Sequence, residues 1–423
     1  MRARLSLLYF LQFGVWGCYL TCFGQLLGSL GLGSRIAWFY AAIGLVSLIT
    51  PALTGHLADR IGSAKKLLAA CHGCAAVMMG LMWVYASGSE TVEFGGFFVR
   101  YLLFLAFYMP TMALANTATF SLLKQSGREP VDAFPRIRVW GTVGFVAAMW
   151  FVNCAWVHDG HFGLTLGDNP HRFQYTAMQL ACTSLAGFAC AAYCLTLPAS
   201  RAEGGRRLTM GGLRSLMSQA MLRRFLLFAA LCGVCLQISN GFVTPFITHF
   251  AALPDYAGNA IADNATMLFS LSQIAEAVFL LSVGRAIRRF GIRAVLTAGM
   301  AAWSLRFLLL AFGNPGSGMW MLAGSMIVYG VGFNFFTVAG HLYVEQLSPS
   351  GSKGLGQGAM MLMSNGIGAT LGTLVAGAVV NHWCSWVTIG PMRYFMGNWT
   401  APWLIFAVYA LMLAALAHRR VKM

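Results

Sequence analysis

The chain has 423 residues, of which 58% are apolar and only 9% charged, and this composition excludes an ordinary water-soluble protein. The 28 Lys and Arg outnumber the 12 Asp and Glu and give a net charge of +16. Because long apolar runs separate the basic residues, we predict membrane lipid as the partner and no nucleic acid. The eleven cysteines lie mostly inside apolar stretches. They predict neither disulfides nor a metal site, although Cys71–Cys74 and Cys232–Cys235 have CxxC spacing.

Apolar stretches long enough to cross a membrane recur along the whole chain. A spanning helix needs about 20 mostly apolar residues, because its backbone polar groups must bond internally. Twelve stretches qualify, at 5–30, 37–57, 67–87, 95–123, 139–158, 174–198, 225–252, 264–284, 294–313, 319–345, 355–382 and 400–418. The first resembles a signal peptide, but it is long enough to span and lacks a cleavage pattern, so we assign it as a helix. The predicted fold class is all-α integral membrane with twelve transmembrane helices.

The basic residues predict how the chain is oriented. Most of the 28 Lys and Arg fall in segments that are cytoplasmic if the N-terminus is cytoplasmic. We therefore expect both termini in the cytoplasm. The Arg- and Gly-rich connection 199–222 predicts a linker between two six-helix bundles, an N-terminal bundle at 1–198 and a C-terminal bundle at 223–423.

A glycine and charge pattern occurs once in each half. The first copy consists of Gly55, Asp59, Arg60 and Gly62, and the second lies at 284–293 with the same spacing. Two parallel repeats are an architecture of secondary transporters, which hold substrate at the interface of the repeats. The glycines permit close helix approach, and the charges can make contacts that change between states. We expect the first copy to act in gating; the alternative is a solvated turn that only fixes topology.

Polar side chains inside spans are costly and mark candidate functional positions. Glu276 is the only carboxylate near the middle of a predicted span, and Gln273 precedes it on the same helix face. The other candidates are Arg138, Thr142, Phe145, Gln237, Asn240, Phe333, Asn334 and Asn116. Amides and a carboxylate suit the hydroxyl groups and base edges of a nucleoside, and Phe145, Phe333 or Trp16 can form an aromatic wall. For each amide the alternative is a bond between helices without substrate contact.

Several segments resemble a known family. The pattern at 55–62 is similar to the cytoplasmic signature of the major facilitator superfamily. More narrowly, the chain resembles the bacterial nucleoside:H⁺ symporters in FLQFGVWG (10–17), FYMP (107–110), FPRIRVWGTVGF (134–145), LQISN (236–240), SQIAE (272–276), YGVGFNFF (329–336) and QGAMMLMSNGIG (357–368). These segments are scattered over nearly the whole chain.

The resemblance implies a proton-coupled nucleoside importer that works by alternating access in the cell inner membrane. It assigns the nucleoside site to the positions of Arg138, Thr142, Gln237, Asn240, Gln273 and Glu276. No enzyme activity and no cofactor besides the proton gradient is expected, and we expect a monomer. The chain departs from the family at Asn334, where the family has an aspartate, and an amide cannot carry a proton.

Proton coupling in this chain is therefore predicted to rest on Glu276 or to be lost. A carboxylate in a low dielectric tends to be neutral unless a cation pairs with it, so it can take up and release a proton as hydration changes. A permanent pair is the alternative, with Arg138 as a partner, while Arg306 is expected to pack or to reach toward the membrane surface. The other functions that we consider are a proton-independent facilitator, a sugar or polyol permease and a membrane-embedded enzyme.

Overall fold

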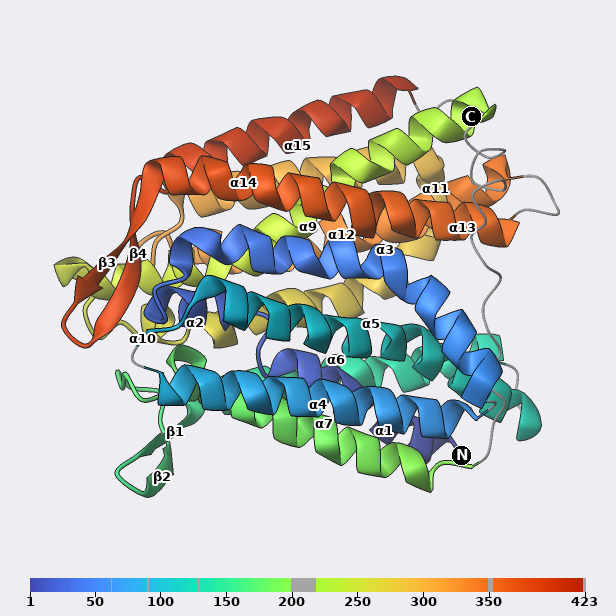
Figure 1. The fold of residues 1–423 in the computed structure, drawn as a ribbon. Helices are drawn as coiled ribbons and strands as arrows, with labels where there is room; N and C mark the ends of the chain where they lie inside the picture. Colours follow the sequence, from blue (N-terminus) through green and yellow to red (C-terminus); the bar gives the residue numbers. More distant parts are fainter. Residues whose placement is uncertain (62, 90, 128–129, 199–217, 349–352, 421–423) are drawn as a thin grey trace. The chain divides into compact units, whose positions relative to one another are not determined.

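The computed structural model describes residues 1–61, 63–89, 91–127, 130–198, 218–348 and 353–420 (Figure 1). Its contacts group these residues into two compact units. The first contains Met1–Leu32 and the chain from Val46 to the end of the first half. The second contains the second half together with Gly33–Leu45.

The helices of the first unit follow the predicted order. They are α1 (Arg2–Gly17), α2 (Phe23–Ser29), α3 (Ile36–Ile61), α4 (Ala64–Gly88), α5 (Phe94–Gln125), α6 (Pro130–Cys154) and α7 (Met178–Thr196), with a 3₁₀ turn at Phe173–Tyr175. A further 3₁₀ turn, Gly33–Arg35, precedes α3 and belongs to the second unit. The beginning of α3 belongs to the second unit, where the Asn381 amide donates to the Ser34 carbonyl over 2.9 Å and the Thr370 hydroxyl donates to the Ala41 carbonyl over 3.2 Å. The predicted domain boundaries do not divide α3 in this way.

The second unit begins with α9 (Ala220–His249). It continues with α10 (Ala260–Asp263), α11 (Ala265–Phe312), α12 (Met319–Leu347), α13 (Lys353–Met361), a π-helical turn (Leu362–Gly368), α14 (Ala369–Trp383) and α15 (Thr400–Arg420), with 3₁₀ turns at Phe250–Ala252 and Pro254–Tyr256. The long α11 contains two of the predicted spans. Gly291, in the second copy of the repeated pattern, separates them with a φ of 79°, a conformation that costs glycine little and other residues much.

Every predicted span has a helical counterpart, but the boundaries differ in places. Within the described residues, nine helices are long and apolar enough to cross a membrane. The count is lower than twelve in part because turns at 18–22 separate α1 from α2 and because α11 is one assigned helix. Twelve membrane crossings and the cytoplasmic location of the termini stay predictions.

One predicted helix extends too far. The span predicted at 139–158 ends at Cys154, where a hairpin of β1 (Ala155–His158) and β2 (His161–Leu164) follows. Asp159 and Gly160 form its turn with φ values of 49° and 75°, which Asp-Gly pairs accommodate. A second hairpin, β3 (Cys384–Ile389) with β4 (Met392–Gly397), precedes α15. Local turn chemistry therefore ends these helices, although the surrounding residues are apolar.

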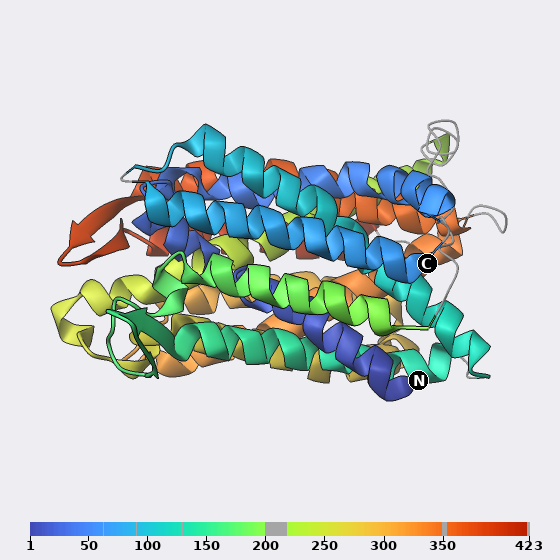
Figure 2. The same ribbon diagram turned by 60° about the horizontal axis from the view of Figure 1, so that its bottom comes forward.

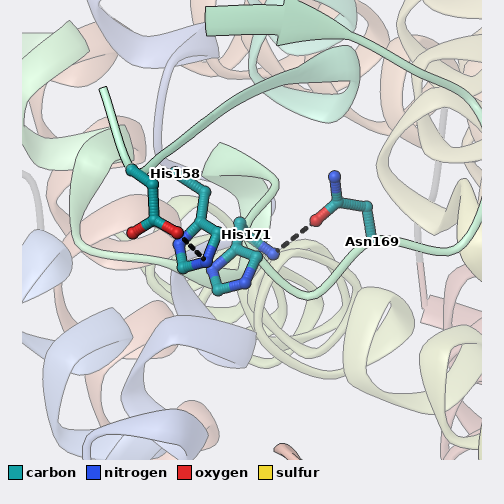
Figure 3. A network of polar contacts seen from close by, with 4 residues as sticks. His158, Asn169 and His171 are labelled. Carbon is teal, nitrogen blue, oxygen red and sulfur yellow. Dashed lines mark hydrogen bonds and ion pairs between the residues drawn. The ribbon is translucent and has the colours of Figure 1, made fainter. Parts of the chain in front are cut away.

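A polar network fixes the loop after the first hairpin. The imidazole rings of His158 and His171 stack with centroids 3.7 Å apart (Figure 3). Asp159 lies 3.2 Å from the His158 ring nitrogen, and the His171 backbone N–H donates to the Asn169 side chain over 2.8 Å. These groups attach the end of the loop to the hairpin.

The proposed gating residues lie mostly outside the described part of the chain. Gly62 lies outside the described residues, and the side chains of Asp59 and Arg60 lie outside them as well. The backbone of Gly55, Asp59 and Arg60 forms the last turns of α3. Their gating role stays a prediction.

Candidate functional site: two sets of polar and aromatic residues

Close contact between α1 and α6 positions the first set of candidates. A Cβ atom at Gly144 would lie 2.1 Å from the Phe10 carbonyl oxygen, and one at Gly17 would lie 2.3 Å from the Phe145 carbonyl oxygen. Only glycine permits this backbone approach. Thr142 and Phe145 of α6 therefore lie on a helix that is packed directly against α1, with Phe145 buried and Thr142 half-buried.

Arg138 lies on an aromatic row of α1. Its guanidinium carbon is 4.0 Å from the centroid of the Phe13 ring, a favourable cation–π contact. The Phe13 ring lies 6.2 Å from Tyr9 and 6.1 Å from Trp16. The sequence indicated Trp16 but missed Tyr9 and Phe13, although spacings of four and three residues place all three on one helix face.

Amide groups of the first unit connect α1 to α5. The Tyr9 hydroxyl donates to the Asn116 side-chain oxygen over 2.5 Å, and the Gln12 amide donates to the Thr111 hydroxyl over 3.3 Å. Asn116 is an exposed residue, whereas Gln12 is buried. The Gln12 side-chain oxygen has no hydrogen-bond partner among the described residues, so it is free to accept one from a bound molecule. The sequence did not single out Gln12.

In the second unit, α9 brings one amide pair together as its spacing predicted. The Asn240 amide donates to the Gln237 side-chain oxygen over 3.5 Å, and both residues are buried. This bond uses one of the two Asn240 donors and leaves the Gln237 amide group able to donate. The pair can therefore orient a polar ligand by both donation and acceptance.

Asn334 connects α12 to α11 next to the predicted proton carrier. Its amide donates to the Glu276 backbone carbonyl over 2.7 Å and to the Gly330 carbonyl over 3.0 Å. A Cβ atom at Gly330 would lie 2.5 Å from the Ala275 carbonyl, so this glycine permits the approach of the two helices. Position 334 thus faces two acceptors and requires a donor. Glu276 and Gln273 are half-buried on the same stretch of α11.

Tyr329 and Phe333 form an aromatic stack on α12 beside these residues. Their ring centroids are 5.9 Å apart and their planes differ by 2°. Tyr329 is buried and lies within electrostatic range of Glu276 and Arg306. The sequence predicted Phe333 as an aromatic wall but did not single out Tyr329, which lies one helical turn earlier.

Arg306 is fully buried, so the expectation that it reaches toward the membrane surface is wrong. Its guanidinium group donates to the Ser239 hydroxyl over 3.1 Å, to the Ser272 hydroxyl over 3.3 Å and to the Ser325 carbonyl over 2.7 Å. The guanidinium carbon of Arg306 lies 4.8 Å from the centroid of the Tyr329 ring. Because its partners belong to α9, α11 and α12, Arg306 connects the helices that carry the second set of candidates. The expectation of a packing role is thus the one that agrees with its position.

The structure groups the predicted residues by unit. Arg138, Thr142, Phe145 and Asn116 belong to the first unit, and Gln237, Asn240, Gln273, Glu276, Phe333 and Asn334 belong to the second. Each unit thus combines aromatic rings with polar donors and acceptors on apolar helices. This is the composition of a multi-pass membrane transporter.

The comparisons with known proteins identify the family. The family model described as "Nucleoside H+ symporter" matches residues 1–422, so the chain belongs to the nucleoside:H⁺ symporter family, as the motifs predicted. The chain is 34% identical to xanthosine permease and 33% identical to nucleoside permease NupG, both from Escherichia coli, over 98% of this chain and 94% of each relative. A solved structure of a single-site variant of NupG superposes with a TM-score of 0.87, with 32% identity and full coverage of both chains. These relatives are permeases, so the prediction that the chain is not an enzyme is confirmed.

Proposed function

We propose that this protein imports nucleosides together with protons across the cell inner membrane by alternating access. The observation that carries the proposal is family membership over residues 1–422. The driving force is the proton gradient, with no further cofactor. We propose that the ten predicted residues, four in the first unit and six in the second, contact the substrate, with Gln12, Phe13 and Tyr329 as further candidates.

The chemistry of the two sets supports a nucleoside as substrate. A nucleobase has two flat faces and a polar edge, and the ribose has hydroxyl groups that donate and accept. Phe13 and the Tyr329–Phe333 stack offer rings to the base, while Gln237, Asn240 and Gln273 offer amides to its edge and to the ribose. A buried polar group of the ligand that finds no partner costs about 1–3 kcal/mol, so these amides select for polar substrates.

We propose that Glu276 carries the proton. Asn334 cannot do so, because an amide keeps its donors at every pH and here uses them on two carbonyl groups. The Asn334 amide donates to both carbonyl groups, whereas a protonated carboxyl group has a single O–H and could donate to only one of them. The Glu276 carboxyl group is half-buried and is the one acidic side chain within α11, Ala265–Phe312.

The amide at position 334, where the family has an aspartate, favours a second candidate function. If the acid at this position provides proton coupling in the family, this chain is a facilitator that equilibrates nucleosides without a proton gradient. Uptake of radiolabelled uridine, adenosine and a neutral sugar into vesicles, with and without an imposed pH gradient, separates the candidates. Accumulation of nucleosides only with the gradient supports the symporter. Equilibration without accumulation supports the facilitator, and uptake of the sugar alone would refute nucleoside transport.

A further inference from the structure

A second group of polar side chains, unrelated to the substrate residues, lies between α4 and α7 of the first unit. His72 of α4 meets Cys190 and Cys194 of α7, and the nitrogen and sulfur atoms lie within 4.8 Å of one another. All three residues are buried, and both cysteines are free thiols. The sequence predicted no metal site, and Cys190 and Cys194 belong to neither of the pairs with CxxC spacing.

The packing of α4 against α7 makes this arrangement. The two helices run side by side (Figures 1 and 2). The Ser184 hydroxyl donates to the Ala76 carbonyl over 2.8 Å, and Lys65 donates to the Leu197 carbonyl over 3.1 Å, so the helices are antiparallel. Cys190 and Cys194, four residues apart, share the face of α7 that meets His72.

His72 shows that the group is incomplete. Neither of its ring nitrogens has a hydrogen-bond partner among the described residues, although the side chain is fully buried. The Tyr108 ring lies edge-on to the imidazole at 5.9 Å, but its hydroxyl donates to the Gln12 carbonyl instead. Buried polar groups without a partner are rare and costly, and an unoccupied ligand position is one of their causes.

We propose that His72, Cys190 and Cys194 bind a thiophilic d¹⁰ metal ion, Cu⁺ or Zn²⁺. Thiolate sulfur and imidazole nitrogen are the ligands that these two ions prefer. Coordination uses a neutral imidazole and deprotonated thiols, so binding releases one proton from each coordinating cysteine, two in all. Three ligands complete a trigonal Cu⁺ site, whereas Zn²⁺ takes a fourth ligand besides these three residues.

The group lies near one end of each of the two helices. His72 lies eight residues after the start of α4 and Cys190 six residues before the end of α7, which corresponds to roughly 10 Å along each helix. By the predicted topology these ends face the cytoplasm, where thiols stay reduced.

Metal affinity of the purified full-length protein tests the proposal. The reduced, metal-free protein competes with bicinchoninate for Cu⁺ and, in a separate arm, with a fluorescent chelator for Zn²⁺. We expect one ion per chain, and a loss of affinity of more than about 100-fold in Cys190→Ser/Cys194→Ser, because losing an outer partner alone costs up to that factor. The matched control is Cys232→Ser/Cys235→Ser, which removes a buried thiol pair of the second unit and should leave affinity unchanged. Binding of neither ion, or equal affinity in both double variants, would overturn the proposal.

His72→Leu gives a readout that a purely structural role would not give. Leucine fills the space without unpartnered nitrogens, so the metal-free variant should melt at or above the temperature of the parent. The parent should melt higher when the retained ion is added, because an ion that binds only the folded state stabilises it, and the variant should lose this gain. A metal-free variant that melts lower than the parent, with the metal-dependent gain retained, would show that His72 is a packing residue and not a ligand.

Discussion

The two units use different chemistry on similar helical scaffolds. In the first, aromatic rings of α1 meet a cation of α6 where glycines allow close approach of the two backbones. In the second, amides and an acid gather on α9, α11 and α12, and a buried arginine joins these helices through hydroxyl and carbonyl groups. The comparison shows that a repeated arrangement of helices does not repeat its site chemistry. Among the candidate residues, ring contacts are the main feature of the first unit and hydrogen bonds that of the second.

The close α1–α6 contact of the first unit should make its glycines sensitive to substitution. Gly144→Ala places a Cβ atom against the Phe10 backbone carbonyl, which cannot move without shifting α1. We expect destabilisation of about 3 kcal/mol or more, the upper range for overpacking. Thermal unfolding of the detergent-solubilised protein measures it.

The matched control for this variant is Gly73→Ala on α4, where a Cβ atom would meet nothing within 4 Å. Alanine favours a helix over glycine by about 1 kcal/mol, so this variant should be equally or more stable. Equal melting temperatures for the two variants would contradict the importance of the α1–α6 contact.

The acid of the second unit should control energy coupling. Glu276→Gln keeps the shape and the hydrogen-bonding ability of the side chain but cannot exchange a proton. One proton per nucleoside supports about tenfold accumulation per pH unit, since one unit equals about 1.4 kcal/mol. We expect this accumulation to vanish while exchange of nucleoside across the membrane continues. Glu93→Gln, at an exposed position before α5, is the control. Undiminished accumulation in Glu276→Gln would remove this residue from the coupling mechanism.

The amides of the second unit should contribute to affinity. Gln237→Ala removes a buried donor and acceptor and should weaken uridine binding by about 1–3 kcal/mol if the amide contacts the substrate. Isothermal titration or competition binding measures the change, with Gln125→Ala at the exposed end of α5 as control. Unchanged affinity would show that the Gln237 amide only joins helices.

The smallest expected effect is a change in the pH profile. In Asn334→Asp the new side chain faces the Glu276 and Gly330 carbonyls and can donate only when protonated. Transport by this variant should therefore fall as pH rises through the titration of the aspartate, whereas Asn334 itself does not titrate. Uptake measured over a range of internal and external pH tests this. Identical profiles for variant and parent would contradict the contacts described for position 334.

Part of the site could be predicted from the sequence because helical spacing is a local property. Gln237 and Asn240 are three residues apart, and the structure joins their side chains. The family motifs identified the family, and the full-length match confirmed it. Tyr9 and Phe13 had the same kind of signal, since they lie on one face with Trp16, but aromatic residues are so common in spans that the spacing alone did not distinguish them.

By itself, the sequence determined that this is a membrane protein of many helices and which polar residues share a helix face, because apolar length and periodicity depend only on neighbouring residues. Only the tertiary structure decided that Arg306 is buried among three helices, that Asn334 donates to the Glu276 carbonyl, and that His72 meets two cysteines more than a hundred positions away. Such contacts depend on which helices pack together and at what height along them. Glycines and small residues set that packing through backbone approach, which no local pattern of polarity specifies.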